Sequence, residues 1–262
     1  MLSIVTDEVS YDPMTAVSLA YEWGIRHFEL RRVFLKRVPY IEEEGHQVLE
    51  EIRRIYRDVD FVAISPGLFE LDMAHWEFAW HRGAKLDESI RMCERLGAKT
   101  LVTFGVKNTG KESFQQIVDL FGDAAARTGK AGLQVAVEPH KGNWIEGAAS
   151  GKKVFDAVGA KNLGLNWDAS NARGCGEEPL EFYAMARPFI KHVHVKGSLA
   201  SGKVAVVGED DVGWPELFKR FAADRVDVAF SVETHMKPKV ERSRACVENT
   251  VKFMKAAGLK LV

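Results

Sequence analysis

The stretch "IKHVHVKG" (190–197) carries the pattern that decides the fold. Side chains alternate between the two faces of a strand, so His192, His194 and Lys196 would share one face while two valines occupy the other. An exposed edge strand would explain this arrangement without any function. A strand whose polar face lines a metal site would also explain it, and the remaining strands decide between the two.

Strand-like and helix-like runs alternate along the whole chain, which is the order expected of βα units around a parallel sheet. Helix signals lie between the strand-like runs. Asp12-Pro13 opens a helical run that stops at Gly24, and two further runs, 84–96 and 239–257, each end before a glycine. The eight predicted strands are 2–6, 26–30, 60–65, 99–104, 133–138, 162–168, 190–196 and 227–233.

Eight βα units in a chain of 262 residues predict an α/β fold, a (β/α)8 TIM barrel. No linker rich in Gly, Ser or Pro interrupts the alternation, so we predict a single domain over residues 1–262. The rival is a doubly wound open sheet, but neither GxGxxG nor GxxxxGK[ST] is present. Two long βα connections, 31–46 and 197–214, would rise at the carboxyl end of the barrel, where they suit a substrate cover.

Composition limits the partners and the location. Lys plus Arg number 36 and Asp plus Glu 37, so no overall positive charge would attract nucleic acid, and we expect none as a partner. The start "MLSIVTDEVSYD" lacks the features of a signal peptide, and no apolar run approaches the ~18 residues of a membrane span. We therefore expect a cytoplasmic protein without a membrane partner. Cys93, Cys175 and Cys246 form no CxxC pair, which argues against disulfides and a thiolate zinc site.

Four successive predicted strands end in a side chain that can bind a metal. Strands five, six and eight each place bulky apolar residues on one face, and the small or polar face finishes in a carboxylate. Strand seven offers an imidazole from its polar face. The four residues are Glu138, Asp168, His194 and Glu233. Because strand ends converge in a barrel, we expect these side chains to point inward together.

Three carboxylates in one place repel one another unless a cation lies between them. A divalent metal ion removes the repulsion. One imidazole and three carboxylates favour Mn²⁺ or Mg²⁺, with Zn²⁺ or Co²⁺ as alternatives. Polar residues also collect at this end of any barrel because solvent and loops satisfy them, but the same arrangement on four consecutive strands favours a metal site.

At these residues the chain resembles the xylose isomerase-like TIM-barrel superfamily of sugar isomerases and epimerases, over essentially its whole length. "AVEPH" (136–140) is similar to the Glu-x-His after strand five of the family, and "NWDASN" (166–171) to its Asp-x-x-His after strand six. "HVHVKG" (192–197) resembles its HvHxKD, and "SVETH" (231–235) contains its closing glutamate. "VVGEDDVGWPEL" (206–217) is similar to the family element before helix seven.

The resemblance implies one divalent metal held by four residues: Glu138, Asp168, His194 and Glu233. It also implies that Glu138 and Glu233 are the catalytic acid and base. Asn171 stands where many members have His, so a substrate or second-metal contact there becomes an amide contact. Gly197 replaces the usual Asp after Lys196, which leaves the partner of that lysine open.

The chemistry that such residues support is proton transfer beside a carbonyl group. A metal chelating the carbonyl and the neighbouring hydroxyl stabilises the enediolate that forms when the α-carbon loses its proton. One carboxylate removes the proton, and the other returns it to the same carbon or to its neighbour. We expect an isomerase or epimerase of a small sugar or sugar derivative. The alternative is a metal-dependent dehydratase, a lyase of an inosose or similar keto-polyol, because the same intermediate can expel a β-hydroxyl.

Five further residues are predicted on the substrate side: Glu29, His140, Asn171, Lys196 and His235. Four of them have alternatives: the two histidines could orient ligands or be surface loop residues, and Glu29 and Lys196 could be members of ion pairs. The expected partner is a small carbohydrate. A homo-oligomer stays open, since members of the family are often dimers or tetramers.

Overall fold

Strands of the computed structural model, which describes residues 1–261, form one closed barrel in the order β1, β12, β9, β8, β7, β6, β5, β2. The predicted (β/α)8 fold is confirmed. The chain also groups into two compact units. We call residues 1–62 and 194–262 the terminal unit and residues 63–193 the central unit. The single domain over 1–262 stays a prediction.

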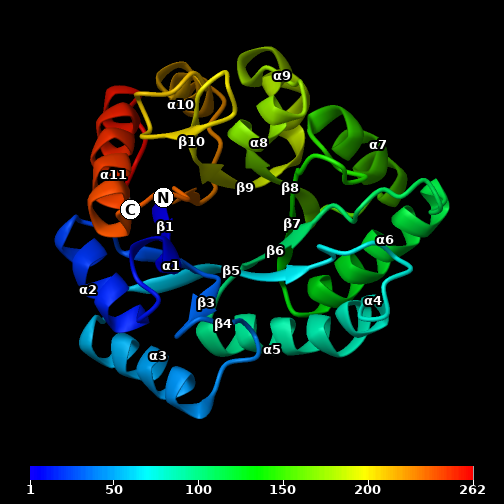
Figure 1. Cartoon of the computed structure of the whole chain (residues 1–262), viewed down its shortest axis with the longest axis horizontal. Coiled ribbons are helices and arrows are strands. Elements are labelled where there is room, and N and C mark those ends of the chain that lie inside the picture. Colours follow the sequence, from blue (N-terminus) through cyan, green and yellow to red (C-terminus); the bar gives the residue numbers. More distant parts are fainter. Residues whose placement is uncertain (262) are drawn as a thin grey trace. The chain divides into compact units, whose positions relative to one another are not determined.

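The terminal unit contains both ends of the described chain, which lie beside β1 (Figure 1). The amide of Leu2 donates to the carbonyl of Leu261 at 2.8 Å. Its elements are β1 (Leu2–Val5), α1 (Thr6–Val9), α2 (Pro13–Glu22), β2 (His27–Leu30), β3 (Arg32–Val33), β4 (Lys36–Arg37), α3 (Glu43–Ile55), β10 (Gly197–Ser198), β11 (Val204–Ala205), α10 (Trp214–Ala223), β12 (Phe230–Val232) and α11 (Lys239–Ala256).

The central unit is a run of βα elements coloured from cyan through green to yellow-green in Figure 1. β5 (Asp60–Leu68) enters it and β9 (Ile190–Val195) leaves it. Between them lie α4 (Phe78–Trp80), the π-helix η1 (His81–Lys85), α5 (Leu86–Leu96), β6 (Thr100–Phe104), α6 (Phe114–Lys130), β7 (Gln134–Glu138), α7 (Ala148–Val158), β8 (Leu163–Asp168), α8 (Ala169–Gly174), α9 (Pro179–Ala186) and the 3₁₀ turn η2 (Arg187–Phe189).

The inner and outer faces of β12 follow the predicted alternation. Ser231 pairs with Ser3 of β1, and its hydroxyl donates to that of Ser3 at 3.1 Å in a fully buried position. Phe230 faces the other way and packs on Phe218 and Phe221 of α10, with ring centroids 5.7 and 5.1 Å apart. The predicted strand 227–233 is too long, because only Phe230–Val232 pairs as a strand.

Predicted helix ends are confirmed where capping residues were present. Asp12 accepts a hydrogen bond from the amide of Met14 at 3.0 Å, and Pro13 occupies the first helical position of α2. The glycine at 97 ends α5 in the left-handed conformation, with φ at 75°. The predicted start of that helix at residue 84 is displaced, since η1 precedes α5 and contains a kink at Gly83.

The two long connections have different structures. The first forms a hairpin, β3 to β4, whose two turn residues, Phe34 and Leu35, both have positive φ and are 38% and 65% exposed. The second, 197–214, packs against α11: Asn249 Nδ2 donates to the carbonyl of Val207 at 2.8 Å, and Val207 is fully buried. A substrate-covering role for either stays a prediction.

The remaining sequence predictions concern cysteines and membrane spans. Cys93, Cys175 and Cys246 are free, as predicted. Among the described residues, no helix combines the length and the apolar character that crossing a membrane requires.

Candidate metal and catalytic site

The carboxylate of Glu233 is the centre of a charged cluster in the terminal unit. It follows β12 and is 3% exposed. Its Oε1 lies 2.5 Å from Arg31 Nη1, and its Oε2 lies 3.3 Å from His194 Nδ1 and 3.6 Å from Lys196 Nζ. Burial alone would raise the pKa of Glu233, but His194 and Lys196 outweigh it and hold this pKa well below its usual range. Glu233 is therefore ionised at neutral pH.

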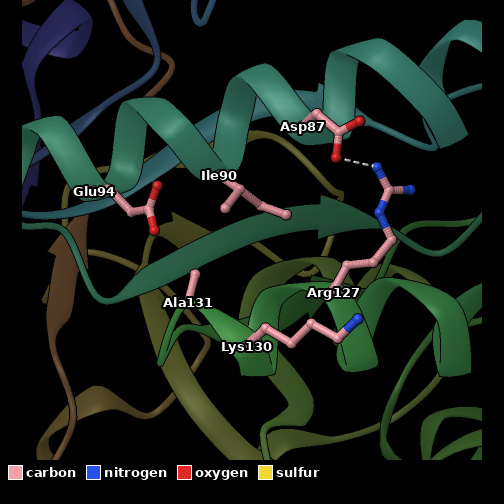
Figure 2. A pocket seen from close by; sticks show the side chains of 6 residues that line it. All are labelled: Asp87, Ile90, Glu94, Arg127, Lys130 and Ala131. Carbon is pink, nitrogen blue, oxygen red and sulfur yellow. Dashed lines mark hydrogen bonds and ion pairs between the residues drawn. The ribbon is translucent and has the colours of Figure 1, made fainter.

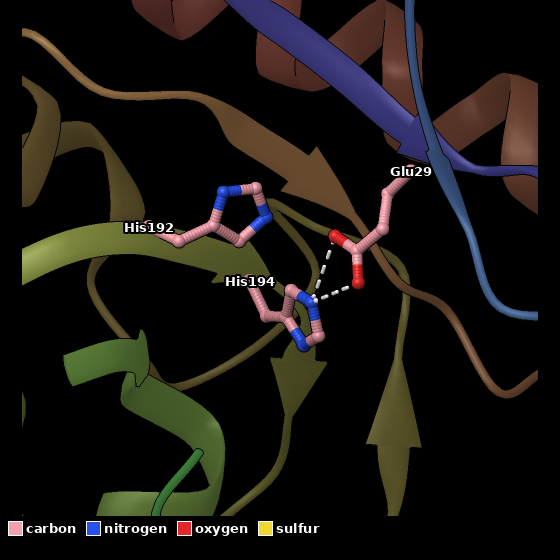
Figure 3. A group of neighbouring side chains, drawn as sticks. All are labelled: Glu29, His192 and His194. Carbon is pink, nitrogen blue, oxygen red and sulfur yellow. Dashed lines mark hydrogen bonds and ion pairs between the residues drawn. The ribbon is translucent and has the colours of Figure 1, made fainter. Parts of the chain in front are cut away.

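A second acid faces the other nitrogen of His194. Glu29 projects from β2 toward the imidazole, as Figure 3 shows, and its two carboxylate oxygens lie 3.0 and 3.1 Å from His194 Nε2. Both side chains are buried, at 0% and 1% exposure. The ring therefore has an acid on each side, with Nε2 toward Glu29 and Nδ1 toward Glu233.

Sequence reasoning missed the acids at the end of β1. Glu8 is 1% exposed, and its Oε1 lies 2.5 Å from Arg31 Nη2. The neighbouring Asp7 lies 3.1 Å from the same nitrogen. Burial raises the pKa of Glu8, but His235 and Arg31 together hold it well below its usual range. The signal was available, because "TDEV" (6–9) directly follows the first strand, at the end where barrel sites are built.

His235 bridges two acids. Its Nδ1 lies 3.1 Å from Glu8 Oε1, and its Nε2 lies 3.4 Å from Glu233 Oε2. Burial would lower the pKa of His235, but hydrogen bonds and charge from Glu233 and Glu8 raise it to about 9. His235 has φ at 53°, a left-handed conformation that is uncommon for a residue other than glycine. His235 thus contacts Glu233, a predicted metal ligand, and a substrate contact of His235 stays a prediction.

In the central unit, one short segment positions two acids. Asp168 ends β8 and caps α8, where its Oδ1 accepts from the amide of Asn171 at 2.8 Å. The side chain of Asn171 donates through Nδ2 to Glu138 Oε1 at 3.0 Å. Glu138 and Asp168 are 7% and 0% exposed, and each offers an oxygen within 4.8 Å of the other's. Two buried carboxylates this close suit a cation between them.

The other predicted substrate residues have structural roles in their own units. His140 is exposed, and its Nδ1 lies 3.3 Å from the carbonyl of Lys141. Lys196 is 5% exposed and pairs with Glu233, which answers the question of its partner. Asn171 donates to Glu138 through its side-chain amide. Contacts of these residues with a substrate stay predictions.

The presence of glycine at position 197 has a steric explanation. It pairs with Ala205 in the β10–β11 hairpin, and a Cβ at position 197 would lie 2.4 Å from the carbonyl oxygen of Ala205. Real Cβ atoms do not approach backbone that closely. The aspartate that the family pattern suggests after Lys196 therefore does not fit this hairpin.

Figure 2 shows the residues that line a depression between α5 and α6 of the central unit. Its volume is about 310 Å³, and an ion pair between Arg127 and Asp87 crosses it. The lining residues are Asp87, Ile90, Glu94, Arg127, Lys130 and Ala131, which lie on α5, on α6 and just after α6. None is a predicted site residue, so this depression is separate from the candidate site.

A model of the xylose isomerase-like TIM barrel family matches residues 17–257. The chain belongs to this family. A similar curated protein is inosose dehydratase 1 of Bacillus cereus (strain ZK), which is 23% identical over 146 residues. That match covers 49% of this chain and 49% of the relative, so it spans about half of each.

Two solved structures share the fold of this chain at low sequence identity. The probable 3-DHS dehydratase AsbF of Bacillus anthracis superposes with a TM-score of 0.79 at 18% identity, over 95% of this chain and 98% of AsbF. An L-ribulose 3-epimerase superposes with a TM-score of 0.80 at 14% identity, over 98% of this chain and 95% of the epimerase.

Metal ions occur in two structures with the same fold. A xylose isomerase-like protein of Mycobacterium smegmatis, in complex with magnesium, has a TM-score of 0.74 at 13% identity, over 92% of this chain and 88% of that protein. The IOLI protein, with a bound zinc atom, has a TM-score of 0.77 at 15% identity, over 98% of this chain and 97% of that protein.

Proposed function

We propose that this protein is a divalent-metal-dependent isomerase or epimerase of a small sugar or sugar derivative. The observation that carries the proposal is that each unit holds a buried pair of metal-ligand side chains at strand ends. Glu138 and Asp168 end β7 and β8, while His194 and Glu233 belong to the ends of β9 and β12. These strands are consecutive in the barrel order.

The proposed ligands of one metal ion are Glu138, Asp168, His194 and Glu233. Three carboxylates and one imidazole fit Mn²⁺ or Mg²⁺ best, with Zn²⁺ or Co²⁺ as alternatives. In the central unit, Glu138 and Asp168 are buried carboxylates with oxygens within 4.8 Å of one another, which supports a cation. When bound, such an ion would supply Lewis acidity that stabilises negative charge on a carbonyl oxygen.

We propose Glu138 and Glu233 as the proton carriers. Glu233 is held ionised by its cationic neighbours, so it would start a turnover as a proton acceptor. Glu138 receives a hydrogen bond from the Asn171 amide, which fixes the orientation of its carboxyl group. Lys196, 3.6 Å from Glu233, is placed to hold a substrate oxygen or to keep Glu233 charged.

A dehydratase is the second candidate, because both the curated relative and one similar structure are described as dehydratases. The same two carboxylates would remove a proton beside the carbonyl and protonate a leaving β-hydroxyl. The two reactions differ in product: an isomerase or epimerase conserves mass, whereas a dehydratase releases water.

The test combines metal analysis with solvent exchange. Purified protein would be analysed for bound metal and then incubated in D₂O with ketoses, inososes and their phosphates. We expect deuterium to enter the substrate at the carbon beside the carbonyl, and we expect Glu138→Gln and Glu233→Gln to lose at least about 100-fold of that exchange. Undiminished exchange in either variant would remove that residue as a proton carrier, and a product lighter by one water would select the dehydratase.

The matched control is Asp58→Asn. Asp58 is an exposed carboxylate that pairs with Arg26 at 2.9 Å, and it lies before β5 rather than at the carboxyl end of a barrel strand. This variant should exchange at the rate of the unchanged protein.

A further inference from the structure

We propose that Glu29 is a positioning residue that keeps a proton on His194 Nε2, so that Nδ1 is the nitrogen offered to the metal. This inference rests on the proposed function, since it assigns a role beside the same site. It differs from the substrate role predicted for Glu29 from the sequence.

The first step is the identity of the hydrogen-bond donor. An ionised carboxylate only accepts hydrogen bonds, so a ring nitrogen lying 3.0 and 3.1 Å from the two oxygens of Glu29 must carry the hydrogen. In a neutral imidazole only one nitrogen is protonated. With the proton on Nε2, the lone pair of His194 is on Nδ1.

The second step is the direction of that lone pair. His194 Nδ1 lies 3.3 Å from Glu233 Oε2, on the side of the ring opposite Glu29. Two acceptors facing each other at this distance repel, so in the metal-free protein a second proton on Nδ1 gives His194 the positive charge that it presents to Glu233, and a bound metal ion would take the place of that proton. A metal ion shared by His194 and Glu233 removes the same repulsion, whereas a metal on Nε2 would have to displace Glu29.

The third step is the rigidity of the arrangement. Glu29 lies in β2, where it is in register with Val5 of β1, and its side chain has no exposed surface. The carboxylate therefore offers no exposed surface to a sugar hydroxyl. The geometry therefore favours an acid that orients a ligand over one that binds substrate.

The test is metal binding, measured independently of turnover. Metal-free protein and the variants Glu29→Gln and Glu29→Leu would be titrated with Zn²⁺ by calorimetry. Loss of an acid that orients a ligating histidine typically weakens metal binding about 10–100-fold. We expect that loss in both variants, while Asp58→Asn should bind like the unchanged protein.

A long-range ¹H–¹⁵N spectrum of the zinc-loaded protein reads the histidine directly. We expect His194 to show a protonated Nε2 and a ligated Nδ1, and His194→Asn identifies its signals. Ligation through Nε2, or unchanged affinity in Glu29→Gln, would overturn the inference while leaving the metal enzyme intact. If the unchanged protein binds no divalent ion, the proposed function and this inference are both overturned. If Glu29→Leu fails to fold, the spectrum and the zinc affinity of Glu29→Gln still test the role of Glu29.

Discussion

The two units hold their buried acids in different ways. In the terminal unit, Glu233 and Glu8 are surrounded by the positive groups of Arg31, Lys196 and His235. In the central unit, the donors that Asn171 provides to Glu138 and Asp168 are neutral amides. Removing the partner of a buried charge leaves that charge unneutralised and lowers the free energy of unfolding strongly. Removing a neutral hydrogen-bond donor lowers it less. The units should therefore respond differently when a donor is removed.

The largest expected effect is that of Arg31→Leu. The variant leaves Glu8 and Glu233 buried without the guanidinium that lies 2.5 Å from each, so we expect the free energy of unfolding to fall by about 3–5 kcal/mol. Urea unfolding of the metal-free protein measures it. A loss below about 1 kcal/mol would mean that other groups neutralise these acids, and the contrast between the units would fail.

The corresponding change in the central unit is Asn171→Ala. It removes the amide that donates to Glu138 at 3.0 Å, and we expect a loss of about 1–2 kcal/mol in the free energy of unfolding. Asn108→Ala serves as a control, because Asn108 accepts from Gly110 in an exposed loop and its loss should be smaller. A loss at Asn171 equal to that at Arg31 would remove the difference between the units.

The variant Asp168→Asn tests the helix-capping role of Asp168 separately from its negative charge. Asparagine caps a helix about as well as aspartate, so α8 should keep its start and the metal-free variant should lie within about 0.5 kcal/mol of the unchanged protein. Because the charge is lost, added Mn²⁺ should raise the melting temperature of the unchanged protein but not of the variant. Equal stabilisation of both by Mn²⁺ would argue against Asp168 as a ligand.

The smallest expected effect is a pH dependence in the terminal unit. The pKa of His235 is raised from 6.5 to about 9, so its charged contacts stabilise the metal-free fold fully below about pH 6.5 and are lost as the pH rises through about 9. The stability difference between the unchanged protein and His235→Gln should therefore be largest near about pH 6 and vanish near about pH 10. A difference that is constant over this range would show that the contacts of His235 do not depend on its charge.

Sequence patterns predicted the barrel well because alternating strands and capped helices are local signals. The Asp12-Pro13 cap and the polar inner face of β12 were readable from single segments. The roles of individual charged side chains were not readable, because they depend on which strand ends become neighbours. Glu29 illustrates this point: its contact with His194 joins residues 165 positions apart.

Two further features escaped prediction for related reasons. Glu8 lies in a helix of four residues, α1, too short to give a periodic signal. The partner of Lys196 is supplied by Glu233, 37 positions later in the chain by the difference of their numbers, and nothing in the local motif indicates it. In both cases the deciding contact is tertiary.

The hairpin that excludes a side chain at Gly197 also constrains how this sequence can change. An aspartate at that position requires the β10–β11 pairing at Ala205 to open, so the single substitution Gly197→Asp should destabilise this hairpin. A side chain at position 197 is therefore compatible only with a different backbone path for the segment around Ala205.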